Sequence, residues 1–264
     1  MNDNITPYVR YIGADDKDLD LFESQYVVPQ GISYNSYVIT DEKIAVMDTI
    51  DQRKTEEWTV RLEEALEGRT PDYLIVQHME PDHAANIGWF AEKYPEATIV
   101  ASAKAIQMMP QFFEEVNFAG RTQTVKEGDT LCLGQHTLKF IMAPMVHWPE
   151  VMLTYEESEK ILFSADAFGK FGALCHEGEW IDEARRYYFN IVGIRGASTG
   201  FAEESRRSGH RHDLSAPRAC LERKLRVLHR ALRYLEQIRT GNGRSCRGLC
   251  LHTWKYGCRR TPDG

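Results

Sequence analysis

The chain has 264 residues, of which 42% are hydrophobic and 27% are charged, and its formal net charge is −7. This length and apolar content suffice for one large domain with a buried core, or for one domain and part of another. No run approaches the roughly 20 apolar residues of a membrane span. The first residues lack the basic and apolar regions of a secretory signal peptide, so we expect a cytoplasmic protein without a membrane partner.

The charge is distributed unevenly along the chain. Residues 1–194 carry 16 Lys and Arg against 33 Asp and Glu, a net charge of −17. Residues 195–264 carry 16 against 6, a net charge of +10, and 14 of the 21 arginines lie there. Such a basic segment is typical of an arm that binds nucleic acid, and that function is one alternative for this chain.

The first 190 residues predict alternating strands and helices joined by short turns. β-forming residues predict strands over residues 33–39, 44–47, 74–76 and 98–101. Apolar residues at helical spacing predict helices over residues 55–66, 84–93 and 103–115. From Gly128 onward, shorter strands are expected over residues 130–133, 137–143, 152–155 and 161–164. This order favours an α/β fold in which two packed sheets carry helices on the outside.

Six side chains that can bind a metal follow the ends of these predicted strands. They are His78, Glu80, Asp82, His83, His147 and Asp166. Loops from separate strands can converge at one edge, which places ligands on a rigid scaffold. Mixed imidazole and carboxylate ligands suit iron, manganese and zinc. Six ligands exceed what one tetrahedral zinc needs, so we predict two adjacent metal ions.

Single members of this pattern are weaker signals than the whole. A histidine such as His147 or an aspartate such as Asp166 is, when alone, more often a structural residue. Tyr187 and Tyr188, which we expect on a strand, are as compatible with packing as with the wall of a substrate cavity. The prediction of a metal centre therefore depends on the joint occurrence of the six ligands.

Four motifs resemble the flavodiiron proteins, from near the N-terminus to about Gly193. They are the stretches Gly31–Ile39, His78–His83, Pro144–Pro149 and Leu162–Gly169. The resemblance implies a metallo-β-lactamase-like αββα sandwich over residues 1–194. Related hydrolases of that superfamily carry a histidine where this chain has Glu80, and they bind zinc. A carboxylate at this position makes the site harder and more anionic, which favours iron.

The same resemblance implies a role for each ligand. His78, Glu80 and His147 would hold one iron, Asp82 and His83 the other, and Asp166 would bridge the two. It also implies an oxidoreductase that reduces dioxygen to water, nitric oxide to nitrous oxide, or both. In the intact family member, FMN in a C-terminal flavodoxin-like domain, a rubredoxin-like electron donor and a head-to-tail homodimer complete the system. We expect no catalytic residue beyond the metal ligands.

The resemblance stops after Gly193, where the basic segment begins. The family has one more histidine ligand in a Pro-Leu-His-Gly-like turn, and no such turn occurs here. Codons chosen for residues 212–220 and read one nucleotide later yield Leu-Pro-His-Gly. The same shift over residues 245–260 yields a strand and a phosphate-binding loop of the flavodoxin type.

We therefore predict a frameshift near residue 194. Residues 195–264 would be an out-of-frame, poorly ordered tail. The αββα sandwich would be incomplete at its C-terminal end, the flavodoxin-like domain would be missing, and the activity of this chain would be impaired.

Two other functions match parts of the pattern. A zinc hydrolase of the metallo-β-lactamase superfamily would use a metal-bound hydroxide, but Glu80 and the absent last histidine disfavour it. A nucleic-acid binder would use the arginine-rich segment with salt-dependent affinity. The basic residues of that segment are irregularly spaced, and a frameshift accounts for them better.

The frameshift makes a prediction about the gene. A fresh read of the coding DNA through the codons of residues 193–196 and past the present stop is expected to show a flavodoxin-like sequence in the shifted frame. If the present codons are in frame and no such sequence follows, residues 195–264 are genuine protein and the hypothesis is wrong.

Overall fold

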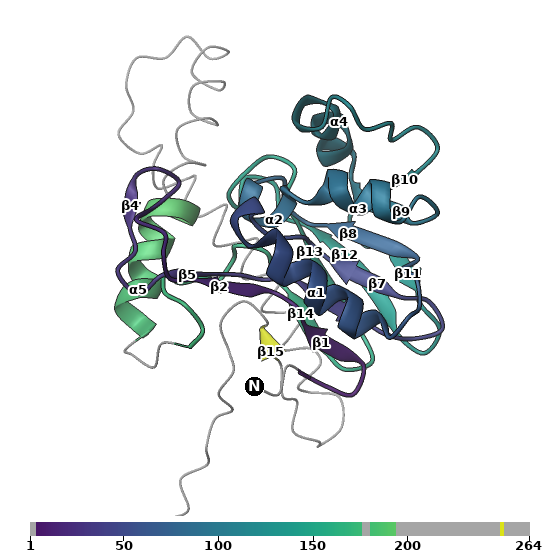
Figure 1. Ribbon diagram of the computed structural model, residues 1–264, viewed down its shortest axis with the longest axis horizontal. Helices are drawn as coiled ribbons and strands as arrows, with labels where there is room; N and C mark the ends of the chain where they lie inside the picture. Colours follow the sequence, from purple (N-terminus) through teal and green to yellow (C-terminus); the bar gives the residue numbers. More distant parts are fainter. Residues whose placement is uncertain (1–3, 176–179, 194–248, 251–264) are drawn as a thin grey trace, which may run out of the picture.

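The structure, a computed structural model, describes residues 4–175, 180–193 and 249–250. Two sheets face each other and form its centre (Figure 1). The first sheet has the strand order β1-β6-β7-β8-β9-β10. Its strands are β1 (Val9–Tyr11), β6 (Tyr37–Ile39), β7 (Ala45–Met47), β8 (Tyr73–Val76), β9 (Thr98–Ser102) and β10 (Thr122–Val125).

The second sheet has the order β11-β12-β13-β14-β15. Its strands are β11 (Thr130–Cys132), β12 (Thr137–Met142), β13 (Met152–Glu156), β14 (Ile161–Phe163) and β15 (Leu249–Cys250). Two small antiparallel pairs join β2 (Ala14–Asp16) with β5 (Ile32–Tyr34), and β3 (Leu21–Phe22) with β4 (Tyr26–Val27).

Four of the five described α-helices, α1 to α4, follow strands of the first sheet and pack on its outer face. The α-helices are α1 (Thr55–Leu66), α2 (Pro81–Ala84), α3 (Ile87–Lys93), α4 (Ala103–Phe112) and α5 (Trp180–Tyr187). A 3-10 turn, η1 (Gln52–Lys54), precedes α1, and a π-helical turn, η2 (Tyr188–Gly193), continues α5. Figure 1 shows α5 beside β4, away from the other helices.

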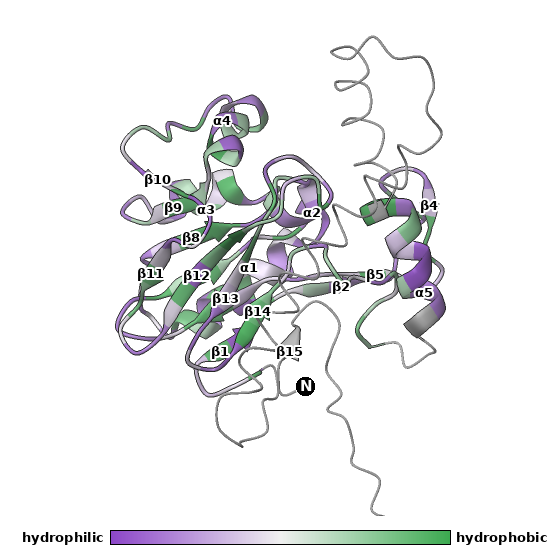
Figure 2. Ribbon diagram, turned by 180° about the vertical axis from the view of Figure 1, so that it is seen from behind, coloured by the Kyte–Doolittle hydropathy of each residue, from purple (hydrophilic) through white to green (hydrophobic). Residues whose placement is uncertain are grey.

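The core has two layers, because alternate residues of the first sheet point to opposite faces. One face packs against the second sheet through residues such as Met47, Ile75 and Phe140. The other face packs under the helices through residues such as Val46, Leu74 and Trp58. Figure 2 shows the central strands as largely hydrophobic and α5 as largely hydrophilic. The predicted α/β sandwich with two facing sheets is thus confirmed.

The strand expected over residues 33–39 is two strands, not one. The strand is interrupted at Asn35 and Ser36, so that β5 pairs with β2 while β6 pairs with β1 and β7. The Ser36 hydroxyl donates to the Asp48 backbone oxygen (2.8 Å) and accepts from the Trp58 indole (3.1 Å). These long-range bonds hold the break, and local strand propensity does not reveal them.

The helix expected over residues 84–93 is also divided. The helical turn α2 begins earlier, at Pro81, and α3 begins only at Ile87. Between them, the Asn86 side chain donates to the Ile50 backbone oxygen (2.6 Å), and its backbone N–H donates to the Thr49 hydroxyl (3.2 Å). The division keeps α2 beside the strand ends rather than in line with α3.

The predicted features of residues 195–264 lie outside the described residues, except for β15. That two-residue strand runs parallel to β14, with Leu249 opposite Ile161. The frameshift and the order of the tail therefore stay predictions. Among the helices of the described part, none is long and apolar enough to cross a membrane.

Two valines give a matched test of the core beneath α1. Val46 in β7 is fully buried, whereas Val60 on α1 is 57% exposed. We expect Val46→Ala to lower the free energy of unfolding by about 2–3 kcal/mol through lost burial and a residual cavity. Val60→Ala should change it by less than about 0.5 kcal/mol. Urea denaturation of both variants checks this, and equal effects would contradict the two-layer core.

Candidate metal centre

All six predicted ligands lie at one end of the sandwich, just past the ends of strands. Parallel pairing of β7, β8 and β9 brings the carboxyl ends of these strands to one edge. His78 and Glu80 lie in the extended segment after β8, and Asp82 and His83 follow in α2. The loop after β12 contributes His147, and the turn after β14 contributes Asp166.

The first group of ligands consists of His78, Glu80, His147 and Asp166. Their ligand atoms all lie within 4.8 Å of one another, and all four residues are buried. The Nε2 atom of His147 is 2.8 Å from Glu80 Oε2 and 2.9 Å from Asp166 Oδ2. The Nε2 atom of His78 is 3.1 Å from the same Asp166 oxygen. Two imidazoles and two carboxylates thus point at one small volume.

The second group consists of Asp82, His83 and Asp166, again within 4.8 Å. His83 Nε2 is 3.1 Å from Asp166 Oδ1 and 3.9 Å from Asp82 Oδ2. Asp166 therefore belongs to both groups and turns one carboxylate oxygen towards each. The two groups contain the same residues as the two ligand sets that the resemblance implies, and Asp166 is in both. That these residues bind metal ions stays a prediction.

Further side chains, which the sequence did not identify, hold the ligands in place. Asp48, at the end of β7, lies 3.2 Å from His83 Nδ1 and is itself held by Gln77, whose backbone N–H donates to it over 2.7 Å. Glu150 lies 2.8 Å from His78 Nδ1. Carboxylates that contact the second nitrogen of a ligating imidazole orient the ring and fix its tautomer. Asp48 directly follows the strand predicted over residues 44–47, and Glu150 follows His147 by three residues. These positions were the available signal.

Tyr187 also contacts the site, but from a helix rather than a strand. It is the last residue of α5, and its hydroxyl donates to Asp166 Oδ1 over 2.7 Å. Its ring packs edge-to-face on Phe171, with ring centroids 5.1 Å apart. The expectation of a strand here was wrong. The contact with Asp166 depends on how α5 packs against the loop after β14.

The backbone around the site adopts strained conformations. Asp48, Met145, Ala165 and Phe168 all have positive φ, at 53°, 70°, 45° and 66°. Residues other than glycine rarely occupy this region unless surrounding contacts impose it, and such positions cluster at functional sites. Here each lies within two residues of a predicted ligand or is itself a partner of one.

The electrostatics of the group reflect mutual pairing of acids and imidazoles. Burial would lower the pKa of His147, but hydrogen bonds to Asp166 and Glu80 outweigh it and raise the pKa to about 9. The pKa values of the other two ligand imidazoles are also raised well above their usual range. Burial raises the pKa of Asp82 to about 7, although the neighbouring His83 charge opposes it. Without a metal ion, the positive charges of the protonated imidazoles therefore compensate the negative charges of the carboxylates.

The donor set fits a pair of metal ions. Three imidazoles and three carboxylates share a buried region, which is costly unless a cation or protons neutralise the acids. Among the described residues, the buried atoms Asp82 Oδ1 and His147 Nδ1 have no hydrogen-bond partner. A cavity of about 410 Å³ reaches Glu80 and Asp82 and is otherwise lined mainly by residues of the β2–β4 region and by Tyr34.

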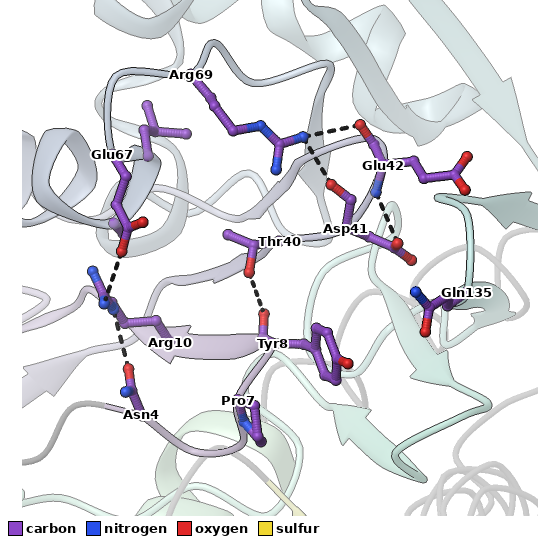
Figure 3. A pocket seen from close by; sticks show the side chains of 12 residues that line it. Asn4, Pro7, Tyr8, Arg10, Thr40, Asp41, Glu42, Glu67, Arg69 and Gln135 are labelled. Carbon is purple, nitrogen blue, oxygen red and sulfur yellow. Dashed lines mark hydrogen bonds and ion pairs between the residues drawn. The ribbon is translucent and has the colours of Figure 1, made fainter.

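A larger cavity, of about 660 Å³, lies away from these ligands beside the turn at residues 40–42 (Figure 3). Both arginines that line it form an ion pair or hydrogen bonds with other residues of the protein. Arg10 pairs with Glu67 at 3.6 Å, and Arg69 donates to the backbone oxygens of Asp41 and Glu42. The arginines of this cavity therefore stabilise the fold, and none of the predicted metal ligands lines it.

Comparison with known families shows the family to which the chain belongs. The family described as ODP family beta lactamase matches residues 32–192, which include all six predicted ligands. The chain belongs to this family. The resemblance to flavodiiron proteins that the sequence motifs indicated is confirmed by similar proteins and by similar solved structures.

One relative is the nitric oxide reductase of Moorella thermoacetica, 33% identical over 71% of this chain and 49% of that protein. Another is the anaerobic nitric oxide reductase flavorubredoxin of Vibrio vulnificus, 32% identical over 73% of this chain and 40% of that protein. Among solved structures, rubredoxin oxygen:oxidoreductase from Desulfovibrio gigas superposes with a TM-score of 0.68 at 29% identity. It matches 78% of this chain and 52% of its own. The chain thus spans about half the length of these relatives, or less.

The raised pKa values predict that metal binding releases protons. At pH 7 the imidazole of His147, with its pKa of about 9, holds a proton in the metal-free protein, and a metal ion must displace it. The apparent affinity for a divalent cation should therefore rise as the pH increases from 6.5 to 8.5. Isothermal titration with Co²⁺ in two buffers of different ionisation enthalpy counts the protons; an affinity that falls over this interval would contradict the assignment.

Proposed function

We propose that this chain is the metal-bearing part of a reductase of dioxygen, nitric oxide or both, with a non-haem diiron centre. One observation carries the proposal: two groups of buried ligands share Asp166, and Glu80 supplies a carboxylate to one of them. The names of the relatives support the two substrates, since one set is called nitric oxide reductase and another an oxygen oxidoreductase.

His78, Glu80 and His147 would hold one iron, Asp82 and His83 the other, with Asp166 between them. Two ferrous ions, when bound, supply two electrons and coordination positions for a small diatomic molecule. The carboxylate-rich set of ligands suits iron better than an all-imidazole set would, because hard anionic oxygens stabilise the oxidised ion.

The chain's own residues would shape access and hold the ligands. The cavity beside Glu80 and Asp82 is lined by apolar side chains such as Phe22 and by two further acids, Glu23 and Asp51. The acids would disfavour an anionic substrate and leave room for a small, uncharged one. The Tyr187 hydroxyl, donating to Asp166 Oδ1, would keep that carboxylate turned between the two groups. The strained turns at Ala165 and Phe168 place Asp166 at its position.

Electron supply would come from outside the described residues. By likeness to the longer relatives, we propose FMN in a flavodoxin-like domain, a rubredoxin-type donor and a head-to-tail homodimer for the intact protein. Without a seventh ligand of the family type, this chain would hold the second iron less tightly and its turnover would be impaired. The cytoplasmic location and the lack of a nucleic-acid partner stay predictions.

Anaerobic iron loading tests the proposal without the flavin. The chain, reconstituted with Fe²⁺ and desalted, is expected to retain iron and to oxidise it in a single turnover when dioxygen or nitric oxide is added. Glu80→Ala should lower retained iron and the single-turnover yield by at least about 100-fold, because it removes a ligand rather than an outer partner. Glu96→Ala, at an exposed glutamate in the turn between α3 and β9, is the matched control and should behave like the wild type.

Metal analysis separates this function from a hydrolase. Preferential retention of zinc, with hydrolysis of an ester or phosphodiester and no reaction of the iron-loaded protein with either gas, would replace the diiron assignment by the hydrolase one.

A further inference from the structure

The ring of His78 is held from the side that faces away from the ligand group. Its Nε2 atom points to Asp166 Oδ2 (3.1 Å) and Glu80 Oε2 (3.3 Å), while its Nδ1 atom lies 2.8 Å from Glu150 Oε1. We propose that Glu150 is a positioning residue that sets the tautomer and orientation of His78 for metal binding. This inference rests on the proposed function of the site.

The chemistry of the two partners determines the tautomer. An ionised carboxylate only accepts hydrogen bonds, so His78 Nδ1 must carry the hydrogen in its contact with Glu150. The backbone N–H of Met79 lies 3.0 Å from His78 Nδ1 and 2.9 Å from Glu150 Oε1, and it can donate to only one of them fully. With Nδ1 protonated, Met79 donates to Glu150, and a metal ion that displaces the Nε2 proton of His78 finds the lone pair on Nε2, the atom that faces the other ligands.

Glu150 is itself fixed at both ends. It is 1% exposed, and its backbone oxygen accepts from the Ser102 hydroxyl over 2.7 Å. Ser102 ends β9 and caps α4 by accepting from the Ala105 N–H. Glu150 therefore joins the segment after β8, through its carboxylate, to the end of β9, through its backbone oxygen, while its own loop supplies His147. One loop thus provides a ligand to the centre and an orienting group to a second ligand.

A second buried glutamate shows how a purely structural carboxylate differs. Glu156, at the end of β13, uses one oxygen for the Ser158 N–H (2.9 Å) and the other for the Glu159 N–H. In Glu150, Oε1 contacts His78 and Met79, while Oε2 is buried without a hydrogen-bond partner among the described residues. A carboxylate retained for packing or turn stability would use both oxygens. The arrangement at Glu150 serves the ring of His78.

The test is a titration of the full chain and its variants with Co²⁺ alone, in which the visible absorption bands of the bound Co²⁺ report binding. Glu150→Ala should weaken binding of the first equivalent by about 10–100-fold, the usual cost of losing an outer partner of a metal ligand. Glu150→Gln should retain more affinity than Glu150→Ala, because its amide oxygen still accepts from Nδ1–H. Glu156→Gln is the matched control; it should lower stability and leave the affinity and the absorption bands unchanged.

Nitrogen-15 NMR of the Zn²⁺-loaded chain gives a readout independent of affinity and of the folding of Glu150→Ala. In the wild type, His78 should show a protonated Nδ1 with a strongly downfield proton resonance. In Glu150→Gln that resonance should move upfield, because a neutral acceptor replaces a carboxylate. An unchanged resonance, or equal affinities in wild type and both Glu150 variants, would overturn the inference.

The outcomes also separate this inference from the proposed function. A wild-type chain that binds neither Co²⁺ nor Zn²⁺ would refute the metal centre itself. A wild type that binds both ions, with Glu150 variants that bind equally well, would leave the metal centre intact and refute only the role of Glu150.

Discussion

The structure depends on the burial of three imidazoles and three carboxylates at one end of a β-sandwich. Taking ionisable groups out of water is costly unless opposite charges or hydrogen bonds compensate. Asp166 meets this constraint by facing both ligand groups, with His147 Nε2 2.9 Å from one oxygen and His83 Nε2 3.1 Å from the other. Contacts from Asp48, Glu150 and Tyr187 hold the ligands from outside the two groups.

The sandwich can hold such a cluster because its ligands begin where rigid strands end. The sheets have well-packed apolar faces, so the segments after β8, β12 and β14 start from positions that the core determines. The strained backbone at Ala165 lies in the segment after β14, and the strained backbone at Asp48 directly follows β7. Such strain persists only where the surrounding structure imposes it, and here the buried strands on either side do so.

An outer layer of acids stands behind the ligands. Asp48 contacts His83 and Glu150 contacts His78, in both cases at the ring nitrogen that faces away from the group. The two acids come from different loops. Asp48 follows β7, a strand that is followed by no ligand, whereas Glu150 lies in the loop that supplies the ligand His147. This arrangement ties the chemistry of the centre to the packing of both sheets.

Much of the site could be predicted from the sequence, because its signals are local. His78, Glu80, Asp82 and His83 fall within six residues after an apolar run, and the boundaries of α1 follow from helical spacing. The positions of His147 and Asp166 after strand ends, together with the family motifs, indicated that they join the same cluster. The first four ligands needed only short-range patterns, whereas His147 and Asp166 also needed the family motifs and the rule that strand ends converge.

What only the tertiary structure decided involves contacts between distant segments. Asp48 approaches His83 across 35 positions and Glu150 approaches His78 across 72, and neither distance leaves a periodic trace. The break at Ser36, the division between α2 and α3, and the helical position of Tyr187 depend on hydrogen bonds to remote backbone or side-chain groups. The sequence by itself determined which residues can bind metal and on which kind of scaffold. The packing of the two sheets decided which oxygen of Asp166 faces which group, because that orientation exists only once the segments after β8, β12 and β14 meet at one end of the sandwich.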